Sequence, residues 1–191
     1  MRIGLLGGSF NPAHAGHRHI IEQARRRLDL DQVWLLVSPG NPLKPQRGMA
    51  PLAQRLASAR TLADDRHVIA TAIEAVLGTR YTVDTLRRLL MRYPRARFVW
   101  IMGADILEQL PRWRRWLEIT RRIPFAVVPR PSYNNRALSG QAAHRLGHAR
   151  RPERMAPLLT DRVAPPAWVF LSVPQHAASA SAIRASEGVE S

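Results

Sequence analysis

The sequence predicts an α/β fold of one domain, in which helices flank a parallel sheet. Short apolar runs that are typical of buried strands alternate with longer segments whose apolar residues recur at helical spacing. Two glycines, Gly7 and Gly8, end the first apolar run, at the kind of position where open parallel sheets bind ligands. The length of 191 residues suits one domain, and no linker or internal repeat divides residues 1–191.

The first half of the chain predicts three strands and two helices. The strands are expected at residues 2–7, 33–37 and 67–70, and the helices at residues 17–28 and 51–62. The first helix has one apolar face, formed by Ile20, Ile21, Ala24 and Leu28. Pro51 fits the start of the second helix, where the amide proton that proline lacks has no helical partner. Residues 38–49 are rich in proline and glycine and predict a loop.

The second half continues the alternation. Further strands are expected at residues 98–102, 125–128 and 168–173, and Thr82 is expected to cap a helix that Pro94 ends. Residues 132–166 are rich in arginine, alanine and proline; a helix is expected at residues 139–146, and the composition is compatible with partial mobility. A short helix is expected to begin at Ser179 or Ser181. The alternation predicts right-handed crossovers and hence a Rossmann-like, doubly wound parallel sheet.

The composition limits where the protein acts and which chemistry it uses. The chain contains no cysteine, which excludes disulfides, thiolate zinc sites and cysteine nucleophiles and fits a reducing compartment. No window reaches the roughly 18 apolar residues of a membrane span, and the N-terminus lacks a secretory pattern. We therefore expect a cytoplasmic protein without a membrane partner.

The charge balance favours anionic partners. The 29 Lys and Arg residues against 14 Asp and Glu residues give a net charge of +15. An arginine-rich, solvated surface explains most of this excess, and no specific nucleic-acid partner is expected, because arginines and aromatic residues interleave only at residues 112–116. Lys44 is the only lysine, and it lies in the proline-rich loop. A compact ammonium group suits a phosphate differently from a guanidinium, so Lys44 is a candidate phosphate ligand.

The strongest motif is Gly-Gly-Ser-Phe-Asn-Pro-Ala-His-Ala-Gly-His at residues 7–17, between the first strand and the first helix. Glycines allow the backbone to approach a phosphate closely, and a helix that starts near Gly16 directs amide groups and its positive dipole end to the same place. His14 and His17 are three residues apart, so both imidazoles can face one anion. The segment lacks the G-x-G-x-x-G pattern of dinucleotide-binding proteins, so hydride transfer loses its main support.

An H-x-G-H motif after a glycine-rich strand end resembles the nucleotidyltransferase superfamily. Four further segments occur in the order expected of its bacterial nicotinate-nucleotide adenylyltransferases: Tyr81-Thr-Val-Asp-Thr-Leu86, Gly103-Ala-Asp105, Trp113 and Ser179-Ala-Ser-Ala-Ile-Arg184. The resemblance runs from residue 1 to about residue 185 and is weak only over residues 132–166. One departure concerns the family's usual I-S-S-T-x-I-R, whose Ile, second Ser and Thr are replaced here by Ala178, Ala180 and Ser181.

The resemblance implies adenylyl transfer from ATP to nicotinate mononucleotide, which yields deamido-NAD and pyrophosphate, with Mg²⁺ arriving on ATP and no metal site formed by the protein alone. The catalytic residues that it implies are His14, His17, Lys44 and Arg184. The ATP-binding residues would be Gly7, Gly8, Ser9, Phe10, Gly16, Gly103, Asp105, Ser179, Ser181 and Ile183. The residues that bind the mononucleotide would be Asn11, Lys44, Thr82, Asp84, Asp105, Trp113, Arg114 and Arg130.

Other interpretations remain open at the level of sequence. Phosphopantetheine adenylyltransferases share the glycine-rich start, but they usually have threonine at the position of His14 and lack the Trp113 region. A basic nucleic-acid-binding protein is a different class, which only the net charge supports. Trp113 could be a core anchor, Thr82 an ordinary helix cap and Asp105 an N-cap. The sequence leaves the oligomeric state open and is compatible with a homo-oligomer.

Overall fold

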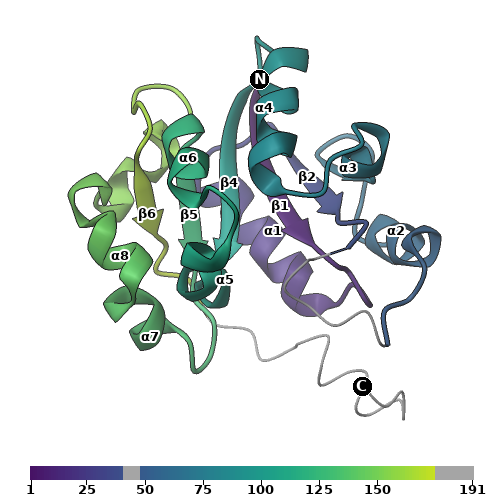
Figure 1. The fold of residues 1–191 in the computed structure, drawn as a ribbon, viewed down its shortest axis with the longest axis horizontal. Coiled ribbons are helices and arrows are strands. Elements are labelled where there is room, and N and C mark those ends of the chain that lie inside the picture. Colours follow the sequence, from purple (N-terminus) through teal and green to yellow (C-terminus); the bar gives the residue numbers. More distant parts are fainter. Residues whose placement is uncertain (41–47, 175–191) are drawn as a thin grey trace.

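The computed structural model describes residues 1–40 and 48–174. These residues form a sheet in which six parallel strands lie in the order β3-β2-β1-β4-β5-β6 (Figure 1). The strands are β1 (Arg2–Gly8), β2 (Gln32–Val37), β3 (Val68–Thr71), β4 (Arg97–Gly103), β5 (Phe125–Val128) and β6 (Trp168–Phe170). The predicted Rossmann-like, doubly wound parallel sheet is therefore confirmed.

Helices cover both faces of the sheet. They are α1 (Ala15–Arg27), α2 (Leu52–Arg60), α3 (Ile73–Val76), α4 (Thr82–Arg92), α5 (Ala104–Gln109), α6 (Trp116–Arg122), α7 (Asn134–Ser139) and α8 (Gln141–Arg145), with short 3-10 helices η1 (Leu110–Arg112), η2 (Gly147–Ala149) and η3 (Glu153–Leu158). Residues of α4 to α8 belong to one apolar cluster, and residues of α1, α2 and η3 belong to a second. In Figure 1 the helices α4 to α6 lie on the near side of the sheet and α1 lies on its far side.

Alternating side chains on the strands divide the core into these two clusters. On β4, Phe98, Trp100 and Met102 face the first cluster, whereas Val99 and Ile101 face the second. All five side chains are at least 95% buried. A strand that is buried on both faces gives a continuous apolar run in the sequence, which is why the strands were recognisable.

The strand order changes direction between β1 and β4. From β1 the chain moves outward through β2 to β3, and it then crosses to β4 on the other side of β1. In open α/β sheets the ligand crevice lies beyond the carboxyl ends of the strands at this point. Gly8 ends β1 and Gly103 ends β4, so two glycines border the crevice.

Most predicted boundaries differ from the structure by one or two residues, and three differences have a physical reason. The N-cap of α4 is Tyr81, in extended conformation, and Thr82 is the first helical residue. The helix expected at residues 139–146 is divided at Gly140, whose extended backbone ends α7 and begins α8. The last strand ends at Phe170 and not at residue 173, because it pairs along its length with the short β5 and on its other side forms only one bridge, to Arg150.

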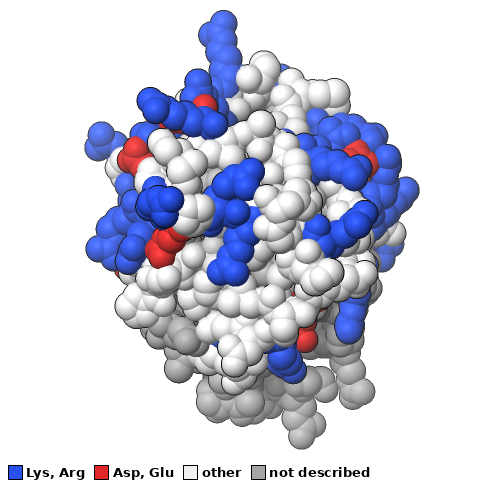
Figure 2. Space-filling view, turned by 90° about the vertical axis from the view of Figure 1, so that its left-hand side faces the viewer, with Lys and Arg blue, Asp and Glu red and all other residues white. Residues whose placement is uncertain are grey.

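The arginines are spread over the face of the molecule that Figure 2 shows. On this face they form several separate groups with uncharged surface between them, and few acidic residues lie among them. This pattern resembles a solvated arginine-rich surface more than a continuous track for a nucleic-acid backbone. Within the described residues, no helix has the length and apolar character needed to cross a membrane.

Candidate active site

The glycine-rich segment approaches the crevice with its backbone. A Cβ atom at Gly7 would lie 3.1 Å from the Trp100 ring, and one at Gly8 would lie 3.0 Å from the Phe10 ring. Phe10 is 1% exposed and has a positive φ of 49°, so its ring anchors the turn from inside the molecule. Side chains at the two glycine positions would have to push these rings aside, which explains why the strand ends in glycines.

The two histidines meet at the start of α1. His14 is the N-cap, and its backbone amide donates a hydrogen bond of 3.3 Å to Nδ1 of His17. The two imidazole rings lie 3.9 Å apart between centroids, and the ring of Phe10 lies 4.8 Å from that of His17. His14 is buried and His17 is half-buried. Both imidazoles therefore lie where the amides and dipole of a 13-residue helix favour an anion.

Gly48 and Ala50, which precede α2, are hydrogen-bonded to the glycine-rich segment. The side-chain amide of Asn11 donates to the carbonyl of Gly48 over 2.9 Å, and its oxygen accepts from the amide of Ala50 over 3.2 Å. The guanidinium of Arg55 donates to carbonyls on both sides, including that of Ser9 over 3.0 Å. These bonds hold Asn11 against Gly48 and Ala50, and its predicted contact with the mononucleotide stays a prediction.

At the end of β4 the structure brings Gly103, Asp105 and Arg130 together. Gly103 is the N-cap of α5, which leaves Asp105 inside the first turn and not at the cap. The Nε atom of Arg130, which follows β5, lies 3.4 Å from Oδ1 of Asp105. A Cβ atom at Gly103 would lie 2.4 Å from that same oxygen. Glycine at this position therefore leaves room for the ion pair at the edge of the crevice.

Thr82, Asp84, Trp113 and Arg114, four residues of the predicted mononucleotide site, lie around the start of α4. Thr82 and Asp84 lie in the first turn of α4, whose leading amides have no partner within the helix. The guanidinium of Arg114 lies 4.7 Å from the ring centroid of Tyr81, the N-cap residue. The half-buried Trp113 stands perpendicular to Trp100, with 6.4 Å between ring centroids. Because Trp100 also contacts the Gly7 position, this group adjoins the glycine-rich segment.

Five predicted site residues lie outside the described residues: Lys44, Ser179, Ser181, Ile183 and Arg184. The departures from the family motif at Ala178 and Ala180 lie there too. The remaining predicted residues lie at the carboxyl ends of β1 and β4, on segments that follow β1, β4 or β5, or around the start of α4.

Arg55 is the residue that sequence reasoning missed. It is 3% exposed, and burial lowers the pKa of its guanidinium. A signal was present, because Arg55 lies three or four residues from Leu52 and Ala59, on the stripe that faces the core. An arginine on an apolar stripe is rarely tolerated without several hydrogen-bond partners.

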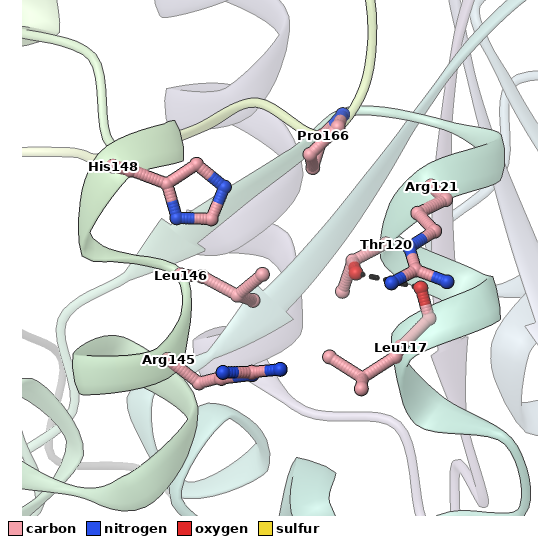
Figure 3. A pocket seen from close by; sticks show the side chains of 7 residues that line it. All are labelled: Leu117, Thr120, Arg121, Arg145, Leu146, His148 and Pro166. Atoms are coloured by element: carbon pink, nitrogen blue, oxygen red, sulfur yellow. Dashed lines mark hydrogen bonds between the residues drawn. The ribbon is translucent and has the colours of Figure 1, made fainter.

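A cavity of about 260 Å³ lies elsewhere, at the amino ends of β5 and β6. In Figure 3 side chains of α6 face side chains of α8 and η2 across it. Its lining residues are Leu117, Thr120, Arg121, Arg145, Leu146, His148 and Pro166. None of them was a predicted site residue, and the cavity lies at the opposite edge of the sheet from the glycine-rich segment.

Comparison with known proteins identifies the family. The family model described as cytidylyltransferase-like matches residues 5–186. A curated protein of Gluconobacter oxydans, named probable nicotinate-nucleotide adenylyltransferase, is 57% identical over 97% of this chain and 95% of its own length. A protein of the same name from Gluconacetobacter diazotrophicus is 58% identical over 97% of this chain and 86% of its own length.

A solved structure shares the fold at low sequence identity. The Plasmodium falciparum nicotinic acid mononucleotide adenylyltransferase, solved in complex with NaAD, superposes with a TM-score of 0.70. The match covers 96% of this chain and 82% of that protein, at 14% identity. Together with the glycine-rich segment and its two histidines, these matches show that the chain belongs to the cytidylyltransferase-like family, within its nicotinate-nucleotide adenylyltransferases.

Proposed function

We propose that the protein transfers the adenylyl group of ATP to nicotinate mononucleotide, as a step of NAD biosynthesis. A phosphate oxygen of the mononucleotide attacks the α-phosphorus of ATP in line, and the bond from that phosphorus to the bridging oxygen of the β-phosphate breaks. The products are deamido-NAD and pyrophosphate. The observation that carries this proposal is the His14–His17 pair at the start of α1, directly behind the glycines that end β1.

This reaction requires no nucleophilic side chain, because the acceptor phosphate is the nucleophile. The protein contributes positioning and donors for the phosphate oxygens. The bond from the His14 amide to Nδ1 of His17 requires an unprotonated Nδ1, so the neutral ring carries its proton on Nε2. We assign Nε2 of His17 to an oxygen of the α-phosphate and the imidazole of His14 to the triphosphate.

Mg²⁺ is proposed to enter with ATP. The groups at the end of β1 are amides and imidazole rings, which suit phosphate oxygens better than a hard cation. When bound, Mg²⁺ neutralises charge on the triphosphate and favours the departure of pyrophosphate. Lys44 and Arg184, both outside the described residues, are proposed to supply further cations to the phosphates.

The acceptor is proposed to bind between the start of α4 and Trp113. The indole of Trp113 stacks on the pyridine ring, while amides near Thr82 and Arg114 receive the carboxylate. Asp105 binds ribose hydroxyls from the end of β4, where Arg130 holds its carboxylate in place. We place the reaction in the cytoplasm, since the cysteine-free chain suits a reducing compartment that contains ATP.

The deciding experiment measures pyrophosphate release from ATP with a panel of acceptors. The panel contains nicotinate mononucleotide, nicotinamide mononucleotide and phosphopantetheine, together with a reaction that lacks acceptor. We expect the highest kcat/KM with nicotinate mononucleotide and formation of deamido-NAD in equal amount to pyrophosphate. Turnover with phosphopantetheine alone, or salt-sensitive RNA binding without turnover of any acceptor, would contradict the proposal.

A further inference from the structure

The side chain of Arg55 donates four hydrogen bonds to backbone carbonyls near the crevice. Its Nε atom donates to the carbonyl of Ala50 over 2.8 Å. One terminal nitrogen donates to the carbonyls of Ser9 over 3.0 Å and Ser38 over 2.6 Å, and the other donates to the carbonyl of Pro39 over 3.3 Å. Four carbonyls from three separate stretches of chain are thus joined by one side chain.

These three stretches border the crevice, and a fixed spacing between them would keep the ATP site in one shape. Ser9 follows the glycines that end β1, Ser38 and Pro39 follow β2, and Ala50 precedes α2. Arg55 is 3% exposed, and its guanidinium is held by carbonyl oxygens. Within residues 1–40 and 48–174 it forms no ion pair with a carboxylate. Removing a cation from water costs free energy. A buried arginine therefore indicates that its hydrogen bonds hold an arrangement of the backbone that the protein requires.

We propose that Arg55 is a positioning residue of the ATP site, which fixes the glycine-rich segment at Ser9 relative to the flanks of the β2–α2 connection. It touches neither the acceptor nor the reacting atoms in this role. It acts through the backbone of the segment that receives the triphosphate. This inference rests on the proposed function for the identity of ATP, and it adds a residue to which the motif assigns no role.

The geometry separates this role from that of the acceptor site. The bonds of Arg55 end on segments that follow β1 and β2, whereas Trp113 and Thr82 lie beside the start of α4. Loss of Arg55 should therefore weaken ATP binding more than binding of the mononucleotide, whose ring and carboxylate are proposed to bind beside α4. A residue that merely stabilised the whole fold would lower the melting temperature without this selectivity.

The test compares Arg55→Gln and Arg55→Lys with the parent protein. Glutamine removes the charge and most of the donors, while lysine keeps a cation that cannot reach four carbonyls in the same plane. Arg60→Gln is the matched control, because Arg60 is exposed near the end of the same helix. The measurements are the Kd for ATP alone by calorimetry, the KM for each substrate, and the melting temperature.

We expect Arg55→Gln to raise the Kd for ATP about 10- to 100-fold, on the scale of a 1 Å misplacement of a binding group. Arg55→Lys should give an intermediate Kd, and the KM for nicotinate mononucleotide should rise by a clearly smaller factor than the Kd for ATP. An unchanged Kd for ATP in a folded Arg55→Gln protein overturns the proposal. If this variant does not fold, Arg55→Lys decides in its place by the same criterion.

The direct ATP measurement also separates this inference from the proposed function. If the parent protein binds ATP but turns over no mononucleotide, the proposed acceptor is wrong, and the effect of Arg55 on ATP binding still decides the positioning role. If both substrates lose affinity equally in Arg55→Gln, Arg55 supports the fold in general, and the inference is overturned.

Discussion

The side of the crevice that is proposed to bind ATP and the side that is proposed to bind the acceptor are held in place by different interactions. On the ATP side, after β1 and β2, the side chains of Asn11 and Arg55 bind backbone groups of neighbouring segments. On the acceptor side, around the start of α4, aromatic surfaces dominate: Arg114 covers the ring of Tyr81, and Trp113 stands against Trp100. The ATP side should therefore respond to single polar substitutions, and the acceptor side to the loss of aromatic area.

Behind its leading turn, each side also contains a buried side chain of opposite charge type: Arg55 in α2 and Glu74 in α3. Arg55 stays charged, because a guanidinium does not lose its proton in proteins. Glu74 of α3 is 7% exposed, and its Oε1 accepts a hydrogen bond of 3.1 Å from the hydroxyl of Thr85 in α4. Burial raises the pKa of Glu74, and the Thr85 hydrogen bond opposes the shift. The support that Glu74 gives to the acceptor side should therefore depend on pH, whereas the support that Arg55 gives to the ATP side should not.

The largest effect is expected for His17→Ala on the ATP side. Removing a donor to the α-phosphate should lower kcat by about 100-fold or more. The lost bond to the His14 amide should lower stability by about 0.5–2 kcal/mol, the usual scale of a helix cap, so the protein should remain folded. Steady-state kinetics and thermal unfolding check both effects, with the exposed His144→Ala as control. Near-normal turnover in the folded variant would remove His17 from the mechanism.

The choice between acid and amide tests the acceptor side. Backbone amides near Thr82 and Arg114 can pair with both oxygens of a carboxylate, but an amide group would turn an NH₂ toward a donor. An unpaired buried donor costs about 1–3 kcal/mol, and charge-assisted bonds to the carboxylate add to this. We expect at least about 100-fold higher kcat/KM for nicotinate than for nicotinamide mononucleotide. The preference should persist at high ionic strength, since salt screens only the long-range contribution of the +15 charge.

A smaller and more selective effect is expected for Trp113→Ala. Stacking of a base on an aromatic side chain contributes about 1–3 kcal/mol, so the KM for the mononucleotide should rise about 10- to 100-fold. The KM for ATP should not change, because the ATP side depends on other residues. Trp113→Phe retains a ring and should recover most of the affinity. Equal increases in both KM values would show that Trp113 supports the two sides together through Trp100.

The comparison of the two sides also shows which features the sequence could predict. The buried strands and the His14–His17 helix start were predictable, because local periodicity and an eleven-residue segment specify them. The burial of Arg55 left a signal in the sequence, but its partners could not be predicted, since its bonds reach carbonyls 46 and 17 residues away at Ser9 and Ser38. Only the tertiary fold brings those carbonyls to one guanidinium.

The start of α4 illustrates the limit of local signals in another way. Thr82 has a better capping side chain than Tyr81, yet Tyr81 is the N-cap. Its ring packs against the first apolar cluster and beneath the guanidinium of Arg114. Tertiary packing therefore outweighs the capping preference here, and the helix begins one residue earlier than it would with Thr82 as its N-cap.

The smallest predicted effect concerns Glu74, and its sign follows from the raised pKa. Below the pKa of the unfolded chain, Glu74 is protonated in both states and burial imposes no charge penalty. As pH rises through the interval up to the raised folded-state pKa, the unfolded chain releases the proton first and the folded state loses stability. Glu74→Gln removes this loss while an amide oxygen can still accept the hydrogen bond from Thr85.

The melting temperature of Glu74→Gln relative to the parent should therefore be nearly unchanged below the ordinary pKa of a glutamate. The difference should increase as pH rises to the raised folded-state pKa and should then stay constant. The gain should be a few degrees, since 1 kcal/mol corresponds to about 2–4 °C in a chain of this size. The matched control is Glu22→Gln on the exposed side of α1, which should show no such trend. A constant difference at every pH would mean that water or a cation compensates Glu74 in the folded state. The Glu74–Thr85 hydrogen bond would then not be the pH-dependent support of α4 that the burial of Glu74 implies.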